Sequence, residues 1–129
     1  MENLKKGKEM IKEGNAILEE RQNSYGSYKD NVEKIEKLVE NNFLMNGFGA
    51  YMLALKLVRL HNHFVMTGNW HEDSLVDFYN YLRLERDRRG NDGFVFMVEG
   101  LYYTLDALIN MCETDMFKGF YVRKLSTII

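Results

Sequence analysis

Residues 49–89 read GAYMLALKLVRLHNHFVMTGNWHEDSLVDFYNYLRLERDRR. The pattern predicts two helices joined by a short turn at residues 67–69, Thr-Gly-Asn, and a short turn places consecutive helices antiparallel. Each predicted helix is apolar on most of its sides, which is typical of a buried helix. We therefore expect this antiparallel pair at the centre of the molecule.

Each of the two predicted helices carries one narrow polar stripe. The stripes recur at helical spacing and consist of Lys56, Arg59 and His63 on the first helix and of Asp73, Asp77 and Asn80 on the second. Charges on a buried helix need partners or a ligand. Two interpretations stay open. Either the stripes form an ion-paired seam that fixes the helix register, or they line a pocket where cations hold phosphate and acids bind Mg²⁺ or a ribose.

The composition of the 129-residue chain is that of one folded domain, residues 1–129, with a sizeable core. Hydrophobic residues make up 46% and charged residues 28%, which is typical of a soluble globular protein and not of a disordered one. The chain has no proline, which favours long uninterrupted helices. A net charge of −2 offers no attraction for nucleic acid or for an anionic membrane surface.

The expected location is the cytosol. A single cysteine, Cys112, has no partner for an internal disulfide, which suits a reducing intracellular setting. The N-terminus lacks the apolar core of a signal peptide, and no apolar run is long enough to span a bilayer.

The segments before the central pair predict two more helices. Residues 2–22 read as a charged amphipathic helix with a thin apolar stripe, and residues 23–28 read as a turn built around Gly26. Ser27 or Asp30 caps the next helix, which we expect to end at residues 41–42. Residues 43–49 then form an apolar connection. Within the central pair, we expect Thr67 or Asn69 to cap the second helix and Gly90 to end it.

The segments after the central pair are less determined. Apolar residues recur at helical spacing from residue 94 to Cys112, which favours one helix there with Cys112 in the core, although residues 94–98, FVFMV, also suit a short strand. Residues 117–129 predict a terminal strand, or an apolar tail that docks on the bundle or on a second subunit. The predicted fold class is all-α, a four- to five-helix bundle with a central antiparallel pair and a short C-terminal tail or strand. We expect a homo-oligomer.

Other candidate chemistry is weaker. His61 and His63 stand two apart on a predicted helix and point to nearly opposite sides, so they do not share one metal ion easily. The tyrosines suit stacking on a base, but aromatic side chains are also ordinary core residues of a bundle. The sequence contains no glycine-rich phosphate loop, no Cys-x-x-Cys pair and no nucleophile elbow.

A combination of motifs resembles a group of small phage and prophage proteins, some of them described as nucleotide-modification-associated. The shared pattern is R-x-x-x-YG, an asparagine soon after, K-x-x-R on one helix and D-x-x-x-D-x-x-x-Y on the next. The matching residues are Arg21, Tyr25, Gly26, Asn31, Lys56, Arg59, Asp73, Asp77 and Tyr81. These proteins look like distant relatives of the MazG-type all-α nucleotide pyrophosphohydrolases. The resemblance covers about residues 17–86.

The resemblance implies nucleotide chemistry with one departure. MazG-type enzymes hold Mg²⁺ with an E-x-x-E pair on one helix and an E-x-x-D pair on the next. They hydrolyse the bond between the α- and β-phosphates of a nucleoside triphosphate. Here Lys56 and Arg59 take the place of the first pair, and Asp73 and Asp77 represent the second at altered spacing. Two carboxylates alone make a poor binuclear Mg²⁺ cage, since such sites need several oxygen ligands. The resemblance therefore implies nucleotide binding more than hydrolysis.

The leading hypothesis is a phage-type protein that binds a nucleotide or a nucleotide-derived small molecule between its central helices. The residues expected to contact phosphate, base or sugar are Lys56, Arg59, His63, Tyr25, Asn80 and Tyr81, and those expected to bind Mg²⁺ or sugar are Asp73 and Asp77. The alternative is a non-enzymatic phage protein that inhibits a host defence or metabolic enzyme by binding it. In that case the apolar tail, FYVRKLSTII, offers a contact surface. An open polar pocket beside the cations would favour the small molecule.

Overall fold

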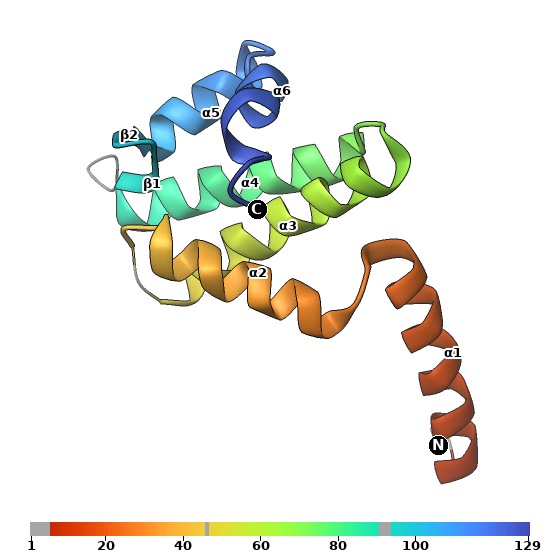
Figure 1. Cartoon of the computed structure of the whole chain (residues 1–129). Coiled ribbons are helices and arrows are strands. Elements are labelled where there is room, and N and C mark those ends of the chain that lie inside the picture. The colour runs from red at the N-terminus through yellow and green to blue at the C-terminus, as the bar shows by residue number, and fades with distance from the viewer. Residues whose placement is uncertain (1–5, 46, 91–93) are drawn as a thin grey trace.

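A computed structural model describes residues 6–45, 47–90 and 94–129, and helices dominate it (Figure 1). The elements are α1 (Gly7–Tyr25), α2 (Tyr28–Asn41), α3 (Phe48–Thr67), α4 (Glu72–Arg89), β1 (Phe94–Val98), β2 (Leu101–Thr104), α5 (Leu105–Glu113), α6 (Phe117–Phe120) and a π-helical turn (Tyr121–Leu125). The prediction of an all-α bundle is confirmed. Within the described ranges, no helix is long and apolar enough to cross a membrane.

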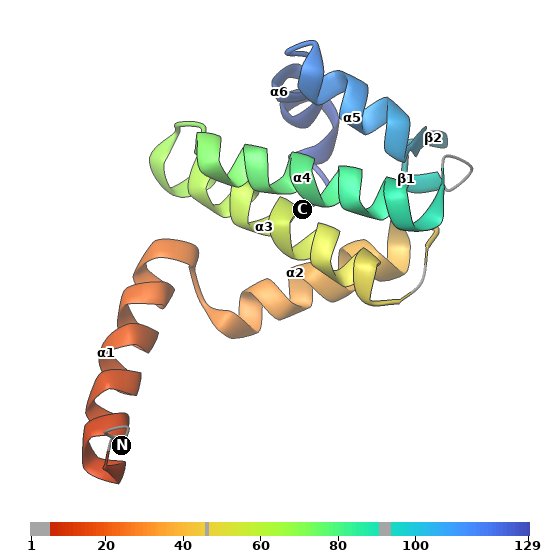
Figure 2. The same cartoon turned by 180° about the vertical axis from the view of Figure 1, so that it is seen from behind.

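The antiparallel pair α3 and α4 forms the centre of the bundle (Figures 1 and 2). Gly68 ends α3 in the left-handed conformation, with φ of 74°, which lets the chain reverse within a few residues. Helix α2 packs on α3, and α5 packs on α4. The expectation of burial on most sides holds for α3 but not for α4, which buries only Phe78, Leu82 and Glu85.

The helix ends agree with the sequence prediction in part. Ser27 caps α2 by accepting a hydrogen bond from the Asp30 amide, and Gly90 ends α4. The predicted cap of α4 is wrong, because His71 occupies that position. Thr67 instead stabilises the end of α3 and the turn that follows. Its hydroxyl donates to the His63 carbonyl and accepts from the Asn69 amide.

Helix α1 ends later than predicted, and parts of some predictions lie outside the described residues. Helix α1 continues to Tyr25, three residues past its predicted end, where Gly26 stops it with φ of 85°. The predicted start of this helix, residues 2–5, lies outside the described residues, as do residue 46 of the apolar connection and residues 91–93.

The predicted helix from residue 94 is wrong for its first half, which forms the β1–β2 hairpin. Glu99 and Gly100 have φ of 52° and 78°, and two consecutive positive φ values make the tight turn that suits a twisted hairpin. The hairpin is fixed to the end of α2, because Met97 and Asn42 exchange two hydrogen bonds. The helical pattern begins only at α5, which Thr104 caps by accepting from the Ala107 amide.

The C-terminal segment docks on its own bundle. Phe117, Phe120, Tyr121 and Leu125 are buried in the core, so the docked-tail interpretation is confirmed and the terminal strand is not formed. Cys112 is partly buried and packs against this core, and burial raises the pKa of its thiol to about 11.

A buried polar pair links α3 to the C-terminal segment. His61 Nδ1 and the Tyr121 hydroxyl form a hydrogen bond between two side chains that are both almost fully buried. Burial lowers the pKa of His61, and the nearby charge of Lys34 lowers it further. Burial also raises the pKa of Tyr121 to about 12. Both side chains are therefore neutral at pH 7.

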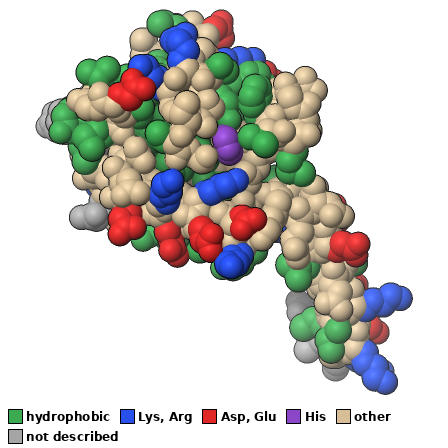
Figure 3. Space-filling view, in the orientation of Figure 1, with side chains coloured by type: hydrophobic (Ala, Val, Ile, Leu, Met, Phe, Trp, Pro, Cys, Tyr) green, Lys and Arg blue, Asp and Glu red, His purple; other side chains and the backbone are tan. Residues whose placement is uncertain are grey.

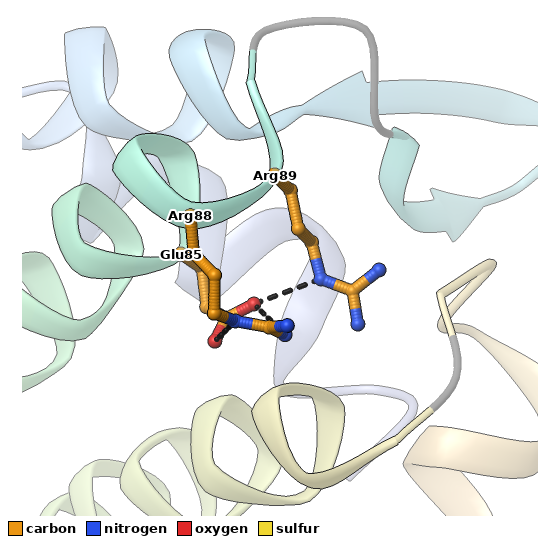
Figure 4. Close-up of polar contacts among 3 residues, drawn as sticks. All are labelled: Glu85, Arg88 and Arg89. Atoms are coloured by element: carbon orange, nitrogen blue, oxygen red, sulfur yellow. Dashed lines mark hydrogen bonds and ion pairs between the residues drawn. The ribbon is translucent and has the colours of Figure 1, made fainter.

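A second buried polar group lies at the end of α4, where the Glu85 carboxylate faces the start of α3. The Glu85 carboxylate accepts hydrogen bonds from Arg88 and Arg89, at 2.8 to 3.1 Å (Figure 4). Burial alone would raise the pKa of Glu85, but the two arginines outweigh it and hold the pKa below its ordinary value. A Cβ added at Gly49 would lie 2.4 Å from this carboxylate, so only glycine leaves room for it.

The lowered pKa of His61 predicts acid-sensitive stability. Protonation favours the unfolded state, in which this pKa is about 6.5. The contribution is therefore complete above about pH 6.5 and is lost as the pH falls from there toward the lower folded pKa, at no more than about 1.4 kcal/mol per pH unit. We expect the Tm of His61→Gln to depend less on pH between about pH 6.5 and pH 5 than that of the wild type.

The control for this measurement is His63→Gln, because the His63 side chain is only half-buried. Thermal melts followed by circular dichroism over the pH series give both results. An unchanged pH dependence in His61→Gln would show that another group is responsible.

The contact between Gly49 and Glu85 predicts a coupled pair of substitutions. Gly49→Ala gains up to about 1 kcal/mol of helix propensity but must displace a carboxylate held by two arginines, so we expect a net loss of about 1 to 2 kcal/mol. In a Glu85→Ala background the obstacle is gone, and Gly49→Ala should become neutral or stabilising. Urea unfolding of the four variants measures this coupling. Equal cost in both backgrounds would contradict it.

Candidate ligand-binding groove

An open groove of about 430 Å³ lies where the start of α4 meets α3 and the end of α1. Its lining is polar except for one valine and consists of Tyr25, Arg59, His71, Asp73, Ser74, Val76, Asp77 and Asn80. Five of the eight residues predicted for the site line this groove: Tyr25, Arg59, Asp73, Asp77 and Asn80. We call it the α3–α4 groove.

Tyr25 is held at the groove by a buried amide. The Asn62 side chain, on α3, donates one hydrogen bond to the Tyr25 carbonyl at 2.9 Å and one to the Asn31 side chain at 2.6 Å. Asn31 donates to the same carbonyl at 2.8 Å, and Lys34 donates to the Asn62 oxygen at 3.1 Å. The network therefore ties the turn between α1 and α2 to the face of α3.

Gly26 makes this turn possible. Its φ of 85° and ψ of −177° lie in a region that glycine alone adopts readily. The Tyr-Gly and Asn parts of the motif quoted above thus meet in one place. They fix the backbone that carries Tyr25 to the groove.

Arg59 is the cation that faces the groove. Its guanidinium lies over the Tyr25 ring, 5.2 Å from the ring centroid, and its side chain is half-buried. Among the residues that the structure describes, Arg59 makes no ion pair. It also lines an adjoining hollow of about 470 Å³ next to Arg21 and Glu20. Arg59 therefore stands at the junction of two open spaces and forms no ion pair with a described carboxylate.

Lys56 lies behind the groove and does not line it. Its ammonium is 2.7 Å from Asp77 Oδ2, with side chains 12% and 46% exposed respectively. The ammonium also lies 5.0 Å from the centroid of the Tyr81 ring, which is likewise outside the lining. The ion-paired seam interpretation thus applies to Lys56, while the pocket interpretation applies to Arg59.

The two carboxylates of the groove differ. Asp77 is neutralised by Lys56, whereas Asp73 is exposed and has no ion pair within the described ranges. Two carboxylates supply only part of the six octahedral ligands that Mg²⁺ takes, and the others would come from water or from a bound phosphate. In the described part of the chain, no group of three or more His, Cys, Asp or Glu side chains could hold a metal ion. The donor set does not form a resident Mg²⁺ site by itself, and Mg²⁺ stays a prediction.

Three lining residues were not predicted for the site: His71, Ser74 and Val76. His71 Nδ1 and Ser74 Oγ form a hydrogen bond of 2.6 Å at the first turn of α4. The His63 ring lies 4.6 Å from the His71 ring, so His63 supports the wall without lining it. His71 and Ser74 are three residues apart at the start of α4, and this spacing could have predicted their contact. That prediction would have required the cap of α4 to be placed at His71.

The groove therefore combines three kinds of side chain. It offers the guanidinium of Arg59, the aromatic ring of Tyr25, and hydrogen-bonding groups of Asp73, Ser74 and Asn80. This set suits a small molecule that has an anionic group, hydroxyl or amino groups, and a planar ring.

Comparison of the chain with protein-family models, with curated proteins and with solved structures found no match.

The Asn62 network predicts that one amide controls the order of the α1–α2 turn. Asn62→Leu leaves the Tyr25 carbonyl and the Asn31 side chain with one donor fewer, which should cost about 1 to 3 kcal/mol. We expect faster amide hydrogen exchange in the α1–α2 turn than in the wild type. The control is Asn110→Leu, at an exposed position of α5. Equal exchange in both variants would show that the network does not hold the turn.

Proposed function

We propose that the α3–α4 groove binds a nucleotide or a nucleotide-derived small molecule. The observation that carries this proposal is the position of Arg59, which is half-buried beside Tyr25 at the groove and has no ion pair within the described ranges. A half-buried arginine without an ion pair can donate the hydrogen bonds of its planar guanidinium to the anionic group of a ligand.

Phosphate is the anion that best suits this position. A guanidinium forms two parallel hydrogen bonds with phosphate oxygens, and the partial burial of Arg59 strengthens such charge-assisted bonds. Because Lys56 is already paired with Asp77, it does not compete for the phosphate. Its role in the proposal is to hold Asp77 in place and to keep that part of the groove neutral.

The other lining residues suit the nucleoside part. Tyr25 is 38% exposed and offers ring surface to a base, and stacking on aromatic rings accepts any base. Asp73 and Asn80 provide acceptors for sugar hydroxyls or for the amino groups of a base. Asn80 already accepts from Arg83 at 2.6 Å, which fixes the orientation of its amide.

The proposal is binding and not hydrolysis. The resemblance to MazG-type pyrophosphohydrolases supports nucleotide as the ligand class, but Lys56 and Arg59 replace the first acidic pair of those enzymes. Of the remaining acids in the groove, Asp77 is already paired with Lys56. The site is thus better suited to hold a nucleotide than to activate a water.

The competing hypothesis, an inhibitor of a host enzyme, has less support. Its proposed contact surface was the C-terminal tail, yet the large side chains of that tail are packed in the protein's own core. An open polar groove beside Arg59 is the feature that a small-molecule ligand requires and that the inhibitor hypothesis does not.

Calorimetric titration tests the proposal with a nucleoside triphosphate, the matching nucleoside, and inorganic triphosphate, each with and without Mg²⁺. We expect the nucleotide to bind and Arg59→Gln to weaken its binding by about 10- to 100-fold, because a charge-assisted hydrogen bond contributes about 1.5 to 3 kcal/mol. Tyr25→Leu should weaken the nucleoside contribution but leave inorganic triphosphate binding largely unchanged.

Two matched substitutions serve as controls. Arg123→Gln and Tyr28→Leu alter the same residue types at exposed positions outside the groove lining, and both should bind as the wild type does. The proposal would fall if no nucleotide bound, or if Arg59→Gln and Arg123→Gln had the same affinity.

A further inference from the structure

Helix α1 projects from the bundle as an arm (Figures 1 and 2). It has 19 residues and none of them is buried. Its main packing contact is with α3, near its C-terminal end, where Tyr25 meets Asn62 and Arg59. Most of the helix is therefore surrounded by solvent.

One side of this arm is apolar. Met10, Ile11, Ile17 and Leu18 are 62%, 66%, 49% and 54% exposed, and Figure 3 shows hydrophobic side chains among the charges of the arm. The four side chains recur at helical spacing and lie on both sides of Gly14, which is at the centre of the stripe. We call these five residues the α1 stripe.

Such a helix is marginal by itself. An isolated helix of this length is only partly formed in water, and Gly7 and Gly14 each lower its stability by up to about 1 kcal/mol relative to alanine. The described atoms leave the space around Gly14 empty, because a Cβ built there meets nothing within 4 Å. The α1 stripe therefore has the residues of a helix–helix contact, but no helix of the described chain packs against it.

We propose that the second helix is α1 of another copy of this chain, packed antiparallel with Gly14 against the partner's Gly14. The stripe is self-complementary in this arrangement, as a two-fold contact requires. About that centre, Met10 comes beside the partner's Ile17, and Ile11 comes beside the partner's Leu18. Glycine at the crossing lets the two helix backbones approach closely.

The charges beside the stripe favour the antiparallel direction. Lys6 and Glu20 lie on the same flank of the stripe, near opposite ends of the helix. Antiparallel packing brings Lys6 near the partner's Glu20 at both ends of the contact. Parallel packing would place this flank of the two helices on opposite sides of the contact, so Lys6 and Glu20 would not meet. Glu13 lies on this flank near the two-fold axis, which limits the strength of association.

The contact is small. Four apolar side chains from each copy fall short of the roughly 1,200 to 2,000 Å² that a stable protein interface buries. We therefore expect a dimer that forms and dissociates in the micromolar range and not a permanent one.

Sedimentation velocity of the full chain, from about 1 µM to about 200 µM, tests the proposal, since this range spans a micromolar Kd. The wild type should pass from monomer to dimer. Gly14→Gln should stay monomeric, although glutamine forms helix better than glycine and a Cβ at this position meets no described atom within 4 Å. Ala16→Gln is the matched control, because Ala16 is exposed on the opposite side of α1, and it should dimerise as the wild type does.

The direction of packing has its own test. Lys6→Glu and Glu20→Lys should each raise the dimer Kd several-fold, and the double variant should restore it, because antiparallel packing exchanges the two charges. A wild type that stays monomeric at every concentration would overturn the proposal. So would a Gly14→Gln dimer as tight as the wild type, or single charge variants without effect.

Discussion

The Asn62 side chain is 7% exposed on α3, and both of its polar atoms are used. Its nitrogen donates to the Tyr25 carbonyl and to Asn31, and its oxygen accepts from Lys34. A buried amide without partners costs about 1 to 3 kcal/mol, so three segments must keep their positions together. The placement of Tyr25 beside Arg59 follows from this constraint, and so does the exit direction of α1.

Lys56 and Arg59 illustrate how one turn of helix separates two roles. Three residues advance a helix by about 300°, so their side chains share a face without being superposed. Lys56 points toward α4 and pairs with Asp77, whereas Arg59 lies toward Tyr25 and the open groove. The first ion pair fixes the helix register and removes one acid from the groove. The remaining cation, Arg59, is the group on which the proposed nucleotide binding rests.

Local signals predicted most of the fold. The α3–α4 pair, the Ser27 cap and the Gly90 stop follow from periodicity, capping and glycine conformation. For residues 94–98 the sequence left a helix and a short strand open, and the favoured helix was wrong. The turn at Glu99 and Gly100 and the hydrogen bonds to Asn42 fix the hairpin instead. The polar stripes predicted the position of the groove. The Asn62 network was not predicted, because Asn62 bonds to residues that are 31 and 37 positions away in the sequence and no local pattern shows such a contact.

In the proposed complex, a nucleotide binds between Arg59 and the first turn of α4. An NMR titration of the ¹⁵N-labelled chain with a nucleoside triphosphate can locate the ligand, because backbone amides and the arginine Nε–H groups report separately. We expect the largest shift changes at the Arg59 side chain and at the amides of residues 25 and 71–77. Shift changes confined to other surfaces, or none at saturating nucleotide, would contradict it.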